Sequence, residues 1–390
     1  CRVAVARAVA AVDDVCRVQH HQSGSLFCGT ALDKVAVQGR CNAGATAPGS
    51  AALRNVYARH ANRVLTVRIL HLPSHDDQPG NIALLFGRGL LGSAVEQRLL
   101  KLCFRPFVEM QSPWPEARAF RHHLDEALAY LMQLAGENTS ELHCIWTAGS
   151  GGFSSSWEDL DTERRAFDEI TDWLHGMEQS DSAVFHYVSS AGGLFEGQVL
   201  ADARSTPDPR RPYGKMKCEQ EARLFDMFGG GPARIRVYRP STVYGPHRYR
   251  RRAGLISHML WNAIYGSPVV LERKLHTLRD YICVDDVAEF MGAMVGSPGV
   301  DLNGVYHLVS ARPASIAEVK LHVERLLARQ LNFCLTSAAG NDADITFSPS
   351  LRPDGWSTTP LEQGLRRVYR ETMLTFRREN PAQMRLVIDR

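Results

Sequence analysis

Beyond residue 80, short and mostly apolar runs alternate with longer segments in which apolar residues recur at helical spacing. This alternation is typical of βαβ units, whose strands form a parallel sheet that is buried on both faces. The short runs predict strands at residues 82–86, 105–110, 141–146 and 183–188. The longer segments predict helices at residues 93–102, 119–135 and 159–173, the last of which is charged and faces solvent. We therefore expect an α/β fold built on a doubly wound parallel sheet.

Residues 1–78 are patterned differently, because they are rich in Ala, Val, Arg, Gly and Ser and contain no Met. The first 18 residues could form an amphipathic helix like that of an organelle transit peptide, although Asp13 and Asp14 interrupt its basic face. A truncated or wrongly started reading frame is the other interpretation. We expect residues 1–78 to belong to no domain and residues 71–80 to be the linker into the first strand. A chain that starts near residue 79 is then expected to fold and work like the whole.

Length and composition fit one large α/β unit with a smaller lobe, since about 310 residues follow residue 80. The formal net charge of +3 on 390 residues argues against nucleic-acid binding as the main task. No apolar run approaches the ~18 residues of a membrane span. Nine cysteines are scattered without a Cys-x-x-Cys pair, which suggests neither a metal site nor a disulfide framework. These features favour a cytoplasmic protein that binds no nucleic acid, membrane or metal.

A glycine-rich turn follows the first predicted strand. Gly87, Gly89 and Gly92 match G-x-G-x-x-G, with a strand before them and helix-forming residues after them. Glycines allow the tight turn and the close approach of backbone to a pyrophosphate, which would then sit on the helix N-terminus. These glycines, with Leu90 and Leu91 between them, are therefore candidate dinucleotide-binding residues. A plain strand–helix turn is the alternative.

Tyr213 and Lys217 are four residues apart, which places them on the same face of a helix. A tyrosine hydroxyl normally keeps its proton up to about pH 10, and a nearby ammonium favours the phenolate. Such a tyrosine can act as an acid or a base near neutrality. Upstream, Ser189 and Ser190 end the run 183–188, as a strand would deliver hydroxyls to a cleft. A solvated helix face and ordinary strand capping are the alternatives.

Five segments in order resemble the extended short-chain dehydrogenase/reductase family, in particular its nucleotide-sugar epimerase/dehydratase branch. They are the Gly87 turn, the Ser189–Ser190 strand end, Tyr213-x-x-x-Lys217, and residues 237–246 and 279–287. The resemblance implies a Rossmann-like sheet with a smaller C-terminal substrate-binding lobe. Residues 79–245 would form the NAD(P)-binding domain. Residues 246–380 would form mainly the substrate-binding lobe, with segments that return to the core.

The resemblance also implies a cofactor, NAD, with NADP possible. Glu109 follows the turn near the position where an acidic side chain would hold the adenosine ribose hydroxyls. Arg88 and Arg105 could instead meet a 2′-phosphate, so NAD is only favoured. Ala148 and Gly149 match the small residues at which the family's backbone passes under the dinucleotide. A loop without a ligand role is the alternative beyond Gly149.

The same resemblance implies the catalytic roles. A bound nicotinamide would take a hydride from a sugar carbon while Tyr213 removes the proton of its hydroxyl. Lys217 would hold the nicotinamide ribose, and Ser190 would bridge the tyrosine and the substrate oxygen, with Ser189 as the alternative. Arg279 matches the family's diphosphate-contacting arginine, a task that suits a guanidinium. A structural ion pair with Asp280 or another neighbour is the other interpretation of Arg279.

One departure from the family discriminates between reactions. Residues 191–193 are Ala-Gly-Gly, where dehydratases of this branch place a carboxylate. This disfavours dehydration and leaves oxidation and reduction at a carbinol. We therefore predict an NAD(P)-dependent nucleotide-sugar epimerase, with a nucleotide sugar as substrate and a homodimer as a possible assembly. The alternatives are a sugar 4-ketoreductase, a dehydratase that draws its acid from Glu196, and a non-catalytic dinucleotide-sensing protein.

Overall fold

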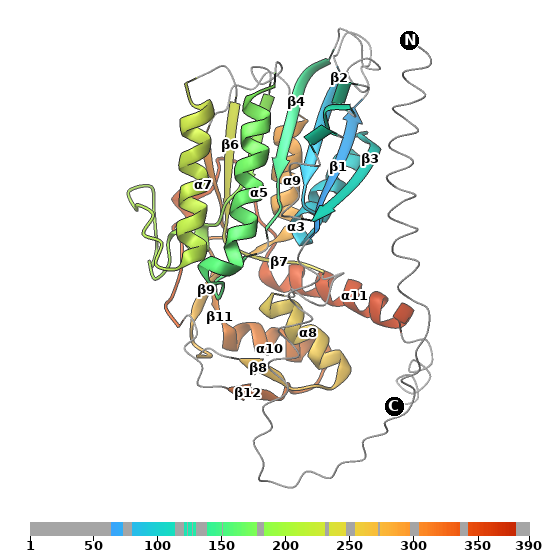
Figure 1. The fold of residues 1–390 in the computed structure, drawn as a ribbon. Helices are drawn as coiled ribbons and strands as arrows, with labels where there is room; N and C mark the ends of the chain where they lie inside the picture. Colours follow the sequence, from blue (N-terminus) through green and yellow to red (C-terminus); the bar gives the residue numbers. More distant parts are fainter. Residues whose placement is uncertain are drawn as a thin grey trace.

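The structure of the protein is a computed structural model that describes residues 64–379 with gaps (Figure 1). All of residues 1–63 and most of the predicted helix 119–135 lie outside the described residues. The gaps are residues 73–79, 114–120, 123, 127, 130–138, 150, 178–182, 231–233, 247–253, 272–273, 297–303 and 336–341.

Among the residues that the structure describes, seven strands form the central sheet, in the order β10-β6-β5-β4-β2-β1-β3. The five strands from β10 to β2 run parallel to one another, whereas β1 is antiparallel to both of its neighbours. The predicted strands that begin with residues 82, 141 and 183 are confirmed as β2, β4 and β5. The bounds are β1 Val64–Leu72, β2 Gly80–Phe86, β3 Arg105–Pro113, β4 Thr139–Trp146, β5 Ala183–Val188, β6 Arg234–Pro240 and β10 Gly304–Leu308.

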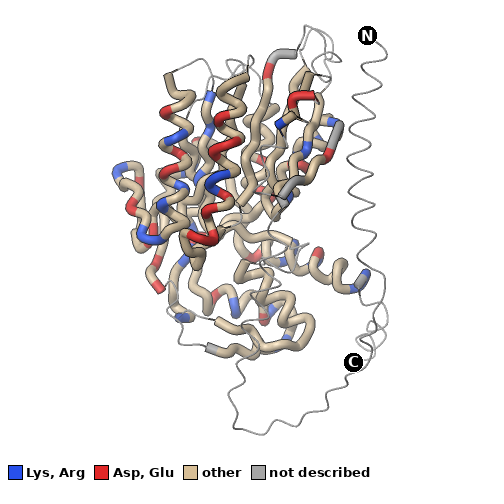
Figure 2. Tube along the Cα trace, viewed as in Figure 1, with Lys and Arg blue, Asp and Glu red and all other residues tan. Residues whose placement is uncertain are grey.

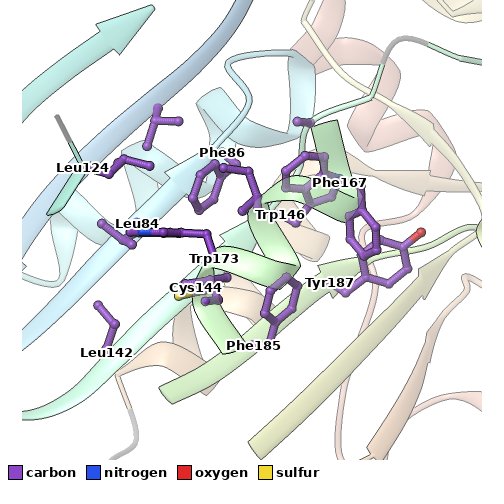
Figure 3. Close-up of a cluster of buried hydrophobic side chains, with 14 of the residues drawn as sticks. Leu84, Phe86, Leu124, Leu142, Cys144, Trp146, Phe167, Trp173, Phe185 and Tyr187 are labelled. Atoms are coloured by element: carbon purple, nitrogen blue, oxygen red, sulfur yellow. The ribbon is translucent and has the colours of Figure 1, made fainter. Parts of the chain in front are cut away.

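Helices cover both faces of this sheet. On one face lie α5 (Trp157–His175) and α7 (Pro212–Phe228), and on the other lie α3 (Leu90–Lys101) and α9 (Val284–Val295). Aromatic rings fill the first interface, where the ring centroids of Trp146 and Phe167 are 5.1 Å apart (Figure 3). Charged residues of both signs are spread along α5 and α7 (Figure 2). The doubly wound α/β fold is confirmed.

Strand β1 corrects the predicted domain boundary at residue 79. It lies between β2 and β3 and pairs with both along its length. Leu65, Val67, Ile69 and Leu70 are at most 1% exposed, so the strand is part of the core. Leu65, Val67 and Ile69 alternate with the half-buried Thr66 and Arg68, and this alternation of apolar and polar residues was the available signal of a strand. Residues 64–72 therefore belong to the sheet.

A chain of buried polar side chains crosses the sheet on the face that α9 covers. Nδ1 of His143 lies 3.1 Å from Nε2 of His186, and Nδ1 of His186 lies 2.8 Å from the Tyr238 hydroxyl. Both histidines are fully buried. Burial lowers the pKa of His143 to about 4 and holds the pKa of His186 well below its ordinary value of 6.5. Both rings are therefore neutral in the folded protein at pH 7.

We expect the folded protein to lose stability as the pH falls from 6.5 towards 4. In that range the unfolded chain binds protons on these two histidines while the folded chain does not, so the free energy of unfolding rises with pH. The stabilisation is complete above pH 6.5, and each histidine contributes a slope of up to about 1.4 kcal/mol per pH unit below it. Urea unfolding at pH 7.5, 6 and 5 measures the slope. An equally steep slope in the double variant His143→Gln/His186→Gln would contradict this assignment.

A smaller lobe packs beyond the central sheet and has its own core. It contains a three-stranded sheet in the order β11-β9-β7 and a parallel pair, β12-β8, packed with three helices. Among the described residues, no helix combines the length and the apolar character needed to cross a membrane. The bounds are β7 Thr242–Tyr244, α8 Leu255–Tyr265, β8 Val269–Leu271, β9 Leu278–Cys283, β11 Pro313–Ser315, α10 Ile316–Leu327, β12 Phe333–Leu335 and α11 Leu361–Glu379.

Candidate functional site

The carboxyl ends of β2, β4 and β5 bring three predicted segments to one edge of the sheet. These parallel strands are neighbours, so the segments that follow them lie side by side. The turn at Gly87 follows β2, Thr147 to Gly149 follow β4, and Ser189 and Ser190 follow β5. This is the edge at which ligands bind in open α/β sheets.

The glycine turn is closed by contacts that leave no room for side chains. Gly87 has φ +98°, and a Cβ there would lie 2.5 Å from the Ala148 Cα. A Cβ on Gly92 would lie 2.1 Å from the Gly87 carbonyl oxygen. By contrast, a Cβ on Gly89 would meet open space at the start of α3, whose first two residues, Leu90 and Leu91, are half-buried. The turn is thus closely packed at Gly87 and Gly92 and open at Gly89, as a binding loop for a pyrophosphate requires. We call this loop, Gly87 to Gly92, the cradle.

Glu109 is linked to this turn by ion pairs with two arginines. It lies on β3, which β1 separates from β2. Its carboxylate is 2.6 Å from Nη1 of Arg68 and 3.2 Å from Nη1 of Arg88. Sequence reasoning missed Arg68, because the strand that carries it was assigned to the leader. Arg105 pairs with His71 at the opposite end of β3, so the structure does not bring it to the turn.

Helix α7 places Tyr213 beside Ser190. The helix begins at Pro212, and Tyr213 lies in its first turn, half-buried. A Cβ on Gly193 would lie 3.2 Å from Tyr213 Cδ1 and 3.3 Å from Ser190 Oγ, so the ring and the hydroxyl flank the same point. The backbone N–H of Gly193 donates to Ser190 Oγ at 3.1 Å. Ser189 is buried, at 3% exposed, and the geometry therefore favours Ser190 over Ser189 as the hydroxyl next to the tyrosine.

Lys217 is held one turn further along α7 in a buried pair with Glu163 of α5. Its Nζ is 5.8 Å from the centroid of the Tyr213 ring and 3.2 Å from Oε1 of Glu163. Burial disfavours the charged ammonium, but Tyr187, Glu163 and Tyr213 outweigh burial and raise the pKa of Lys217 above its ordinary value. Sequence reasoning missed Glu163, because it treated the charges of this helix as solvent-facing. The helical spacing of Glu163 to the buried residues Leu160 and Phe167 was the available signal.

The loop after β4 lies between the glycine turn and the Lys217–Glu163 pair. Ala148 is 5% exposed and packs against Gly87. A Cβ on Gly149 would lie 3.6 Å from Oε1 of Glu163, and the N–H of Gly151 donates to Oε2 of Glu163 at 2.9 Å. Small residues here let the backbone approach both neighbours.

Arg279 is buried within the smaller lobe. It is 4% exposed on β9, and its guanidinium donates to the carbonyl oxygens of Leu278 and Ala343. These contacts hold the guanidinium within the smaller lobe, and the predicted diphosphate contact stays a prediction. The neighbouring carboxylate of Asp280 accepts from Ser241 and Ser310.

A cavity of about 520 Å³ lies beside the glycine turn. Gly89 and Leu90 line it, together with residues of α9 and α11 such as Val284 and Arg367. Tyr213 is not among its lining residues, so the cavity adjoins the cradle rather than the tyrosine. Among the described residues, no cluster of three or more His, Cys, Asp or Glu is arranged to hold a metal ion.

The sheet order, the glycine turn and the Tyr213–Lys217 helix define a Rossmann-type α/β protein. A model of the NAD dependent epimerase/dehydratase family matches residues 87–308, which is more than half of the chain. The chain belongs to this family. No curated protein sequence matches the chain.

Solved structures with a similar fold include three sugar-nucleotide enzymes. The UDP-glucose 4-epimerase of Thermus thermophilus, in complex with NAD, is 19% identical with a TM-score of 0.53, over 64% of this chain and 81% of that chain. The UDP-glucuronic acid 4-epimerase of Bacillus cereus is 15% identical with a TM-score of 0.52, over 64% and 78%. The dTDP-glucose 4,6-dehydratase of Bacillus anthracis is 17% identical with a TM-score of 0.50, over 64% and 76%. At these identities the likeness shows the fold.

Proposed function

We propose that the protein is an NAD-dependent nucleotide-sugar epimerase that oxidises and re-reduces a sugar carbinol. The observation that carries the proposal is the placement of Ser190, Tyr213 and Lys217 at the edge where the glycine turn forms its cradle. Family membership and the NAD complexes of similar structures support it. When bound, a nicotinamide supplies hydride transfer.

The chain's own residues supply the proton transfer and hold the substrate and cofactor. Tyr213 takes the proton of the sugar hydroxyl and returns it, and the Ser190 hydroxyl orients the same oxygen. The Lys217 ammonium favours the ionised tyrosine. An ammonium has three donors, and Glu163 and Gln220 accept from this one at 3.2 and 3.3 Å. The third donor is proposed to meet a ribose hydroxyl.

The cradle binds the dinucleotide through backbone groups at Gly87, Gly89 and the first turn of α3. Glu109 is proposed to accept from the adenosine ribose while it is held by Arg68 and Arg88. The same two arginines favour NADP as the second candidate, because guanidinium groups suit a 2′-phosphate. A cytoplasmic location and a homodimer stay predictions from the sequence.

The geometry also supports epimerisation over dehydration. Glu196, the alternative source of acid for a dehydratase, is 4% exposed. Its Oε1 accepts from Nε of Arg211 at 2.8 Å. This ion pair holds the carboxylate against Arg211, which disfavours it as the acid of an elimination.

Purified protein with UDP-glucose or UDP-glucuronic acid tests the proposed function, with product stereochemistry read by NMR. We expect the 4-epimer, formed without net consumption of dinucleotide. A 4-keto-6-deoxy product would identify a dehydratase, and a requirement for added NADH or NADPH would identify a ketoreductase. Dinucleotide binding without turnover of any nucleotide sugar would favour a sensing protein.

Two glycine substitutions separate the roles of the turn. We expect Gly89→Ala to weaken NAD binding by about ten-fold or more at nearly unchanged thermal stability, because its Cβ points into open space where the pyrophosphate would lie. Gly92→Ala should lower the melting temperature as well, because its Cβ collides with the backbone of Gly87. Calorimetry of binding and thermal unfolding measure both effects. Equal NAD affinity in Gly89→Ala and the unaltered protein would contradict the cradle.

A further inference from the structure

We propose that Glu163 is a positioning residue, which fixes Lys217 against Tyr213 and sets how strongly the ammonium favours the ionised tyrosine. Its effect on turnover rests on the proposed function, whereas its effect on the ionisation of Tyr213 does not. Glu163 belongs to no motif of the sequence and lies 50 residues before Tyr213 in the chain.

Glu163 joins three parts of the candidate site. It extends from α5, is fully buried, and shares its two oxygens between Nζ of Lys217 and the N–H of Gly151. The lysine side chain is itself only 4% exposed. One carboxylate thus links the helix that carries Tyr213 to the loop that packs against the glycine turn. A shift of this carboxylate would move both.

The titratable groups that face Lys217 and Tyr213 from neighbouring positions are neutral or paired. From β5, Tyr187 faces Lys217, but burial raises the pKa of Tyr187 far above its ordinary value, and its hydroxyl donates to Gln220. From α7, Glu221 is bonded by both of its oxygens to the guanidinium of Arg239. Tyr187 is therefore neutral and Glu221 is compensated. Arg211, two residues before Tyr213, is paired with Glu196 at 2.8 Å. The Lys217 ammonium and the Glu163 carboxylate are therefore the pair that we expect to tune the Tyr213 ring.

A carboxylate beside an ammonium weakens the attraction of that ammonium for a phenolate. Lys217 Nζ lies 5.8 Å from the centre of the Tyr213 ring, close enough to act on it, and Glu163 opposes that action. In Glu163→Gln, an amide oxygen can still accept from Lys217, but the opposing negative charge is gone. The Tyr213 ring should then ionise at a lower pH, by about one pH unit. Glu163 therefore holds Lys217 in position but weakens the attraction of the Lys217 ammonium for the Tyr213 phenolate.

The first experiment follows the Tyr213 ring by NMR in the full chain, with tyrosine labelled with ¹³C at Cζ and the signal assigned by its absence in Tyr213→Phe. We expect the titration midpoint to fall by about one pH unit in Glu163→Gln. Glu163→Asp keeps the charge but withdraws it from Nζ, so its midpoint should fall less, by roughly 0.3 pH unit. The matched control is Glu141→Gln. It removes another buried carboxylate, paired with Arg234 at 2.6 Å on β4 and β6, and should leave the midpoint unchanged.

An unchanged or raised midpoint in Glu163→Gln would overturn the inference, as would a shift of equal size in Glu141→Gln. If Glu163→Gln does not fold, Glu163→Asp replaces it as the test. A fall of its midpoint by roughly 0.3 pH unit supports the inference, and an unchanged or raised midpoint overturns it. A role in packing alone would lower thermal stability without moving the midpoint. The titration needs neither cofactor nor substrate, so it decides the role of Glu163 even if the chain converts no nucleotide sugar.

The second experiment reads the consequence for function. The acidic limb of the pH profile of kcat should move to lower pH in Glu163→Gln by the same amount as the NMR midpoint. Dinucleotide affinity should fall about three-fold or more in Glu163→Ala, because the loop at Gly151 loses its anchor. Turnover by the unaltered protein with no displacement of the limb would overturn the inference and leave the proposed function standing.

Discussion

Replacing Tyr213 by Phe is expected to lower turnover by about a thousand-fold or more while the dinucleotide still binds. Only the ionisable hydroxyl is lost, and proton transfer by a positioned side chain contributes about 10² to 10⁴ in rate. The ring keeps its packing, since its centroid lies 6.3 Å from that of Phe153 and its edge faces Gly193. Product formation from UDP-glucose measures the rate, and calorimetry with NAD measures binding, which should stay within about three-fold of the unaltered protein.

A tyrosine outside the site provides the control for this substitution. Tyr265 lies on α8 in the smaller lobe and is 37% exposed, so Tyr265→Phe should keep normal turnover. Near-normal turnover of Tyr213→Phe would remove Tyr213 from the mechanism. Loss of dinucleotide binding together with turnover would instead indicate that the tyrosine shapes the cradle.

The second large effect is expected from removing β1. A chain that starts near residue 79 lacks the strand between β2 and β3, so both lose a row of backbone hydrogen bonds and the core loses four buried apolar side chains. Burying a Val, Leu or Ile side chain contributes about 1.5–3 kcal/mol, and the total stability of a domain is about 5–15 kcal/mol. We therefore expect this chain to have no cooperative thermal unfolding transition.

The matched control is a chain that starts near residue 60 and so retains β1, compared by circular dichroism during heating. A point substitution offers a second route, since Val67→Asp would bury an unpaired carboxylate at a position that is 0% exposed. Its melting temperature should fall by about 10 °C or more. If the chain from residue 79 melts within about 2 °C of the longer one, β1 is dispensable for the fold.

Much of the sheet could be predicted because its strands carry local signals. The run 183–188 coincides with β5, and the runs at 82–86 and 141–146 fall inside β2 and β4, since strands buried on both faces are continuous apolar runs. The position of Val64–Leu72 could not be predicted in the same way. A run of Val, Leu and Ile indicates a strand but not its partner, because Val64 pairs with Pro113, which lies 113 − 64 = 49 positions away.

Among the site residues, too, those with a local sequence signal could be predicted, and those whose role depends on packing between elements could not. Gly87, Ser190, Tyr213 and Lys217 were predicted because their chemistry depends on spacing along one element or on a turn. Glu163 was not, because its role arises only where α5 packs on α7. Arg279 was assigned through resemblance alone. The alternation of β9 placed its side chain against the carbonyl oxygens of the smaller lobe, a packing that no motif records.

The antiparallel strand β1 also affects which part of the sheet can fold first during synthesis. Parallel strands must wait for a helical crossover, whereas β1 and β2 form a hairpin joined only by residues 73–79, which closes with little loss of chain entropy. Three adjacent strands are complete once residue 113 has left the ribosome, before β4 exists. Pulse-labelled amide exchange should show β1 and β2 protected first. The strand that leads into the glycine turn would then be paired before Ala148, which packs against that turn, and the helix of Tyr213 are synthesised.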